Sequence, residues 1–217
     1  MRALQPVCAE QVVARQWMSA AQQVADIQLR YARAGTSLAQ AALAGAKTCV
    51  ELQHYPAKDV VDAVTGNRFY YHAHTSHRSS LEEHGHFHLF HYGQSGKSED
   101  FFHIVGLSID AYGSPLRWFT TNRWVTGERL RQANQIERIL LDFRIQVRGR
   151  LSPIAAWLSA MVRLFSSDIA KILHARDAIL KQRLADSRRA IVLEDRALDI
   201  VSECSISLPL RIRQLYS

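Results

Sequence analysis

The strongest constraint on the fold is a change of periodicity at Arg68. From there to Val125, four stretches are rich in aromatic or β-branched residues, many of them at alternating positions: "RFYYHAH", "HGHFHLFHY", "FFHIVGLSID" and "PLRWFTTNRWV". The later stretches are separated only by short turns. Strands with such short links pair antiparallel, because parallel strands need longer crossovers. We therefore expect a small antiparallel meander of about four strands within residues 68–125.

Helical periodicity flanks this region on both sides. Apolar residues recur every three or four positions in 9–65 and in 128–205, with breaks at Pro56 and at Thr65–Asn67. The pattern predicts an α+β fold, with one domain over residues 1–217. The apolar stripes are Val13, Trp17, Ala20, Val24, Ile27 and Tyr31; Leu130, Ala133, Ile136, Leu140, Phe143 and Val147; and Ala190, Leu193, Ala197, Ile200 and Cys204.

The composition indicates in which compartment of the cell we expect to find the protein. No apolar run approaches the roughly 20 residues that span a bilayer, and the first residues lack the apolar core of a secretory signal. The three cysteines, Cys8, Cys49 and Cys204, are widely spaced and form no disulfide framework. These features favour a cytoplasmic protein without a membrane span.

The net charge of +7 is unevenly distributed along the chain. Residues 117–217 hold 18 Lys and Arg against 10 Asp and Glu. Such a basic half can attract nucleic acid. Its arginines alternate with acids, as in "RLRQANQIERILLDFR", which is more typical of solvated helix faces. Nucleic-acid binding is therefore the less favoured interpretation.

Histidines are concentrated in the strand region, where eight of the ten lie between His72 and His103. Alternate residues of a strand share one face. Tyr70, His72 and His74 thus face one way on the first predicted strand, and His84, His86 and His88 share a face on the second. If the apolar faces of both strands pack on the same helices, the histidine faces must lie together on the other side.

The spacing of these side chains predicts a metal site. His72 and His74 with His86 and His88 would form an all-nitrogen site, and His84 is a fifth candidate. Imidazole ligands suit Zn, Fe, Ni or Cu without choosing among them. The alternative is a solvated strand face, or a set of hydrogen-bonded core residues, that happens to use histidine.

Catalysis would require an acid, a base or an orienting group beside the ion. Glu83, Tyr70 and Asn122 are the candidates for these roles. Asn122 has the alternative role of satisfying a turn. We expect His91 and His103 to lie off the histidine face or to have packing roles, and His54 and His174 to be ordinary surface or packing residues.

Other catalytic patterns are absent: there is no glycine-rich dinucleotide or phosphate loop, no Gly-x-Ser-x-Gly and no His-Glu-x-x-His. Three interpretations remain. The first is a metal-binding protein, with or without hydrolytic or oxidative activity on a small-molecule substrate. The second is a non-catalytic binding or scaffold protein with a basic helical surface and structural or pH-responsive histidines. The third is a haem protein with one axial histidine. The oligomeric state stays open.

The stretches "FYYHAHTSHRSSLEEHGHFHLF", "FTTNRWVTGE" and "WLSAMVRLF" resemble a bacterial family described as a domain of unknown function. They fall within residues 69–165. The resemblance implies a coherent domain and carries over no activity, cofactor or catalytic residue.

Overall fold

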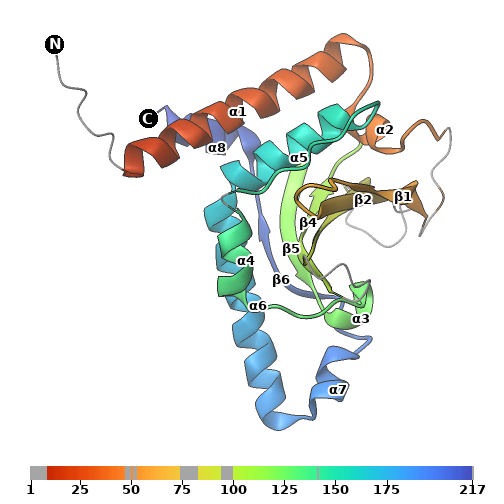
Figure 1. Cartoon of the computed structure of the whole chain (residues 1–217), viewed down its shortest axis with the longest axis vertical. Coiled ribbons are helices and arrows are strands. Elements are labelled where there is room, and N and C mark those ends of the chain that lie inside the picture. Colours follow the sequence, from red (N-terminus) through yellow and green to blue (C-terminus); the bar gives the residue numbers. More distant parts are fainter. Residues whose placement is uncertain are drawn as a thin grey trace.

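The computed structural model describes residues 9–46, 50, 53–73, 83–93, 100–140 and 142–216, which form eight helices and one six-stranded antiparallel sheet (Figure 1). Neighbours in the sheet are also neighbours in sequence. The α+β class and the antiparallel sheet are confirmed, with six strands in the described residues instead of about four. The strands are β1 (His54–Val61), β2 (Asn67–Ala73), β3 (Gly85–Tyr92), β4 (Phe101–Ile109), β5 (Pro115–Thr121) and β6 (Ile200–Ser205).

Strand β1 lies in a segment that the sequence analysis placed in the first helical part, residues 9–65. That assignment is wrong from His54 onward. Pro56 reads as a break in the sequence, but an edge strand tolerates proline because its missing N–H is not needed in the ladder. The register of β1 against β2 also shifts between Tyr55 and Val60, so β1 lacks the regular alternation that marks the next strands.

Strand β6 replaces the second half of an expected helix. The helix predicted from Ala190 to Cys204 is wrong, because α7 (Arg189–Leu193) ends early and Ile200–Ser205 pairs with β5. Backbone hydrogen bonding to β5 decides the conformation here, for instance where Trp118 lies opposite Cys204. The partner strand is some 80 residues earlier, so no local pattern indicates it.

The remaining helices are close to the expected ones, with one exception. The stripe that starts at Leu130 is helical only in α4 (Ala133–Leu140), and its predicted continuation past Leu140 is wrong. There the Ile145 N–H donates to the Ser159 hydroxyl at 2.8 Å, which replaces a helical bond. The other helices are α1 (Ala9–Arg33), α2 (Leu38–Ala42), α3 (Arg123–Thr126), α4 (Ala133–Leu140), α5 (Ser152–Leu164), α6 (Ser166–Asp186) and α8 (Leu208–Leu215).

The two faces of the sheet have different surroundings. One face packs against helices and forms the main core (Figure 1). Phe87 of β3 illustrates this, since its ring centroid lies 6.2 Å from that of the buried Trp157 of α5. The opposite face carries the histidines. Burial of the apolar side thus fixes which way the imidazoles point.

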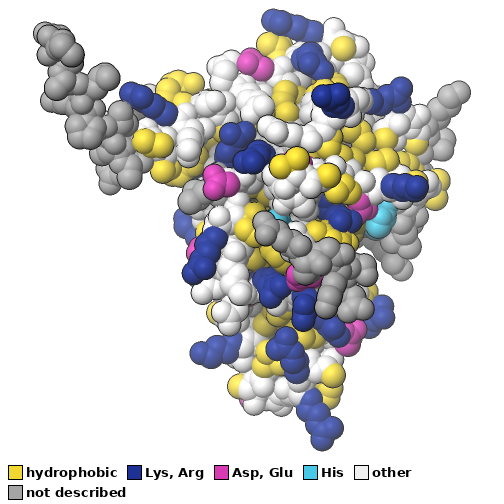
Figure 2. Space-filling view, in the orientation of Figure 1, with side chains coloured by type: hydrophobic (Ala, Val, Ile, Leu, Met, Phe, Trp, Pro, Cys, Tyr) yellow, Lys and Arg dark blue, Asp and Glu magenta, His cyan; other side chains and the backbone are white. Residues whose placement is uncertain are grey.

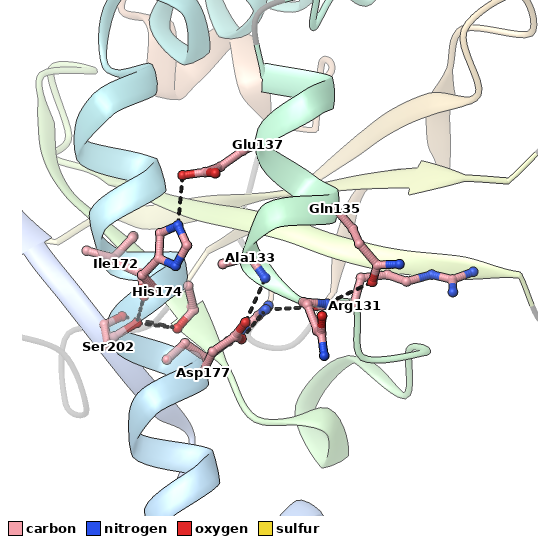
Figure 3. A network of polar contacts seen from close by, with 11 residues as sticks. Arg131, Ala133, Gln135, Glu137, Ile172, His174, Asp177 and Ser202 are labelled. Atoms are coloured by element: carbon pink, nitrogen blue, oxygen red, sulfur yellow. Dashed lines mark hydrogen bonds and ion pairs between the residues drawn. The ribbon is translucent and has the colours of Figure 1, made fainter.

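Polar contacts fasten α4 and β6 to α6 (Figure 3). The Asp177 carboxylate of α6 accepts the Ala133 N–H at the start of α4 at 2.7 Å. Nearby, His174 Nε2 lies 2.9 Å from the Glu137 carboxylate, and the Ser202 hydroxyl of β6 donates to a backbone carbonyl of α6 at 2.6 Å. These contacts give His174 the surface role expected for it.

Among the described residues, no helix combines the length and the apolar character needed to cross a membrane.

Candidate metal centre

The strand register aligns the histidines across neighbouring strands. His54 of β1 lies opposite His72 of β2, which lies opposite His86 of β3. In the next row of the same face, Tyr70 lies opposite His88. Side chains directly across an antiparallel pair are about 5 Å apart, so the alternation in the sequence becomes a compact group of rings.

Three of these histidines could hold a metal ion. One ring nitrogen from each of His72, His86 and His88 lies within 4.8 Å of the other two. Nitrogens bound at about 2.0–2.1 Å to a tetrahedral ion are about 3.4 Å apart. To bind one ion, the three ring nitrogens would therefore have to come closer together by rotation about the side-chain torsions.

Of the other two predicted ligands, only His84 can be placed, and it does not join this group. His74 lies outside the described residues. His84 precedes the first residue of β3, and its Nδ1 lies 2.7 Å from the hydroxyl of Tyr71, which belongs to the core on the opposite face. The expectation that His84 shares the histidine face is wrong, because strand alternation need not extend past Gly85, where the strand begins.

His103 of β4 has a packing role, which was one of the two expectations for it, but it lies on the histidine face. It is buried, and its Nε2 lies 3.1 Å from His88 Nδ1. Its Nδ1 lies 3.2 Å from the Thr121 hydroxyl. Strict alternation would turn His103 to the apolar side with Val105. Leu89 lies opposite Val105, but the next residue, Phe90, lies opposite His103. Ile104 is therefore an extra residue in β4, and the side chains on its two sides follow opposite alternation.

His54, which was expected to be a surface or packing residue, packs on the histidine face. Its ring stacks on Tyr70, with centroids 3.8 Å apart and planes 8° apart. It meets His72 edge-on at a centroid distance of 5.3 Å. The missed strand β1 explains the missed histidine, since only pairing with β2 brings His54 to this face.

Both carboxylate oxygens of Glu83 have partners, His86 and Arg117, so Glu83 is not free to act as a general base. One carboxylate oxygen lies 2.9 Å from His86 Nδ1, and the other accepts a hydrogen bond from Arg117 at 3.0 Å. Arg117 also pairs with Glu203. Burial acts to raise the pKa of Glu83, but the hydrogen bond from His86 and the charges of His86 and Arg117 lower it to about 2. Glu83 is thus an ionised group with both oxygens engaged.

Tyr70 and Asn122, the other catalytic candidates, have different positions. Tyr70 is buried between His54 and His88, and burial, followed by the charges of Asp59 and Glu128, raises its pKa well above the usual value. It is therefore a neutral phenol at pH 7. Asn122 caps α3 and donates to the backbone carbonyl of Val192 at 2.8 Å. This geometry favours the turn-forming role for Asn122.

Glu128 is a buried acid that the sequence analysis did not find. It is 3% exposed and accepts a hydrogen bond from the Thr126 hydroxyl. Burial raises its pKa to about 8, even though its backbone N–H and the charges of Arg176 and Arg123 act to lower it. No pattern in "VTGE" distinguishes it from an exposed loop acid.

The buried imidazoles are in the protonation state that metal binding needs. Burial, with the charges of neighbouring imidazoles, lowers the pKa of His88 well below its usual range. Burial and the charges of Arg176 and His86 lower the pKa of His103 to about 3. Both rings are neutral at pH 7, and a neutral imidazole is the form that ligates metals.

Comparison with known proteins supplies a family and no activity. A family model described as a domain of unknown function (DUF6969) matches residues 18–206. No curated protein and no solved structure matches the chain. Any statement about chemistry must therefore come from the geometry of the site.

Proposed function

We propose that this chain, which belongs to the family DUF6969, binds a transition-metal ion through His72, His86 and His88. The observation that carries the proposal is the convergence of three imidazole nitrogens within 4.8 Å of one another on neighbouring strands.

Three protein ligands suit a catalytic ion better than a structural one. Structural zinc sites have four protein ligands, whereas catalytic sites have three and keep a position for water or substrate. An ion with imidazole ligands could be Zn, Fe, Cu or Ni, and it would supply Lewis-acid or redox chemistry to a small-molecule substrate. The Tyr70 phenol could donate a hydrogen bond beside it. We therefore favour metal-assisted hydrolytic or oxidative chemistry as the activity to test.

The first prediction concerns metal content. Untagged protein should contain close to one equivalent of a transition metal after reconstitution, as measured by elemental mass spectrometry. His86→Ala should lower the content by at least tenfold, because two imidazoles bind much more weakly than three. His174→Ala is the matched control, since that side chain is 59% exposed and pairs only with Glu137 among the described residues.

Absence of metal from the wild type after reconstitution with each ion would contradict the proposal. Equal metal content in wild type and His86→Ala would contradict it as well. Equal content would mean that the metal binds to side chains other than the three histidines.

A cleft at α4 and α6 favours a second candidate function, the non-catalytic binding of an anionic partner. It has a volume of about 980 Å³, and its rim includes Arg131, His174, Lys181 and Arg189. In the part of the chain that the structure describes, Lys181 and Arg189 have no ion-pair partner. Figure 2 shows Lys and Arg side chains over the lower half of the pictured face, where α6 and α7 lie in Figure 1.

Salt-dependent binding distinguishes the two candidates. If the cleft serves an anionic partner, RNA or DNA should bind with an affinity that falls steeply as salt increases, and Lys181→Ala with Arg189→Ala should weaken it. The metal content should be the same in this double variant. No binding at low salt would exclude nucleic acid as the partner.

A further inference from the structure

Two histidines of the site have one ring nitrogen occupied by a defined neighbour. His86 Nδ1 lies 2.9 Å from Glu83 Oε1, and His88 Nδ1 lies 3.1 Å from His103 Nε2. Glu83 and His103 are both buried and both come from outside the proposed triad. A neutral imidazole carries its proton on one nitrogen and binds metal with the other. These contacts therefore bear on which nitrogen can face an ion.

Glu83 determines the tautomer of His86. An ionised carboxylate only accepts hydrogen bonds, so His86 must carry its proton on Nδ1 to make this contact. Arg117 holds the other oxygen at 3.0 Å and keeps the carboxylate in place. The nitrogen that remains for an ion is Nε2.

His103 can have the same effect on His88, provided that the hydrogen bonds run in one direction. If His88 Nδ1–H donates to His103 Nε2, then His103 Nδ1–H donates to the Thr121 hydroxyl oxygen, 3.2 Å away. In the reverse direction Thr121 donates to His103, and His88 would carry its proton on Nε2. Only the first arrangement lets His88 bind an ion through Nε2.

We infer that Glu83 and His103 are positioning residues, which accept the Nδ1 protons of His86 and His88 so that both histidines bind the ion through Nε2. The inference rests on the proposed metal site. Carboxylate or other acceptors behind metal-bound histidines orient the rings in this way, and their loss weakens metal affinity by about 10- to 100-fold. Neither residue needs to touch the ion.

The direct test is the tautomeric state of the two histidines in the zinc-loaded wild type. Long-range ¹H–¹⁵N correlation spectra of ¹⁵N-histidine-labelled protein distinguish Nε2 from Nδ1 ligation. We expect both His86 and His88 to show a protonated Nδ1 and a zinc-bound Nε2. Ligation of either ring through Nδ1 would overturn the inference while leaving the metal site intact.

Substitutions test the same point by affinity. Glu83→Leu and His103→Leu remove the acceptors and should each raise the Kd for Zn²⁺ by about 10- to 100-fold. Glu83→Gln and His103→Gln retain a carbonyl acceptor and should recover part of the loss. Glu203→Gln is the control, because Glu203 also pairs with Arg117, has no hydrogen bond or ion pair with either histidine in the described part of the chain, and is half-exposed.

The outcomes separate this inference from the proposed function. A wild type that binds none of the Zn, Fe, Cu and Ni ions would overturn both. A wild type that binds Zn²⁺, with Kd values for both leucine variants equal to that of Glu203→Gln, would overturn only the positioning roles. Because the tautomer measurement uses the wild type, it remains decisive even if a leucine variant does not fold.

Discussion

Two buried glutamates near the histidine face are in opposite charge states, and the difference comes from their partners. Glu83 bonds to His86 and to Arg117, so its carboxylate is ionised. Glu128 has the Thr126 hydroxyl as its side-chain partner, and burial dominates. Burial alone therefore does not determine the charge of an acid, since a cationic or N–H partner can outweigh the desolvation cost.

At the scale of single residues, one prediction concerns the substitution Glu128→Gln. The pKa of Glu128 rises from 4.5 to about 8 on folding, so its contribution to stability is complete below pH 4.5 and is lost as the pH rises toward 8. Glutamine cannot ionise and avoids this loss. Between pH 5 and pH 9, the free energy of unfolding should fall more in the wild type than in the variant, by at most about 4 kcal/mol. Urea titrations at both pH values measure this, and parallel pH dependences would contradict it.

At the scale of the elements, alternation in the sequence predicted the histidine faces of β2 and β3 because each strand has a buried apolar side. His72, His86 and His88 come together as a result. The position of His103 on this face could not be predicted, because the extra residue of the bulge, Ile104, is apolar and fits either face. β1 and β6 were missed because an edge position and a distant partner strand, respectively, determine them.

The close packing of β4 against β5 yields a prediction about Gly106. Gly106 lies opposite His88 and Phe119 in the ladder, and a Cβ there would lie 2.2 Å from the Phe119 ring. That ring in turn packs edge-on against His86 and His88. Gly106→Ala should therefore displace Phe119, reduce stability by about 1–3 kcal/mol and weaken metal binding.

The measurements are urea unfolding and a Zn²⁺ titration. Val64→Ala serves as the control, since Val64 is 88% exposed and should change neither quantity. If Gly106→Ala had the stability and affinity of the wild type, the contact between Phe119 and the histidines would be unimportant for the site.

At the scale of the whole molecule, the proposed ion would connect strands that are already paired. His72 belongs to β2, whereas His86 and His88 belong to β3. An ion bound only by the folded chain adds its binding free energy to the stability, about 2.7 kcal/mol when its concentration is 100 times Kd.

Calorimetry checks this expectation. For a chain of this size, 2.7 kcal/mol corresponds to an increase in Tm of about 5–10 °C. The increase should appear in the wild type and in His174→Ala, and it should be absent from His86→Ala and reversed by a chelator. An equal increase in His86→Ala would show that Zn²⁺ acts at another site.

The separation of the sheet into a core face and a histidine face has a further consequence. Side chains that stabilise the fold and side chains that could perform chemistry alternate along β2 and β3, so a substitution on one face need not disturb the other. If the proposed ion binds there, evolution or a protein engineer could exchange the imidazoles for other donors, and so change the ion that is bound, while the hydrophobic core stays the same. The scaffold is adaptable for this reason.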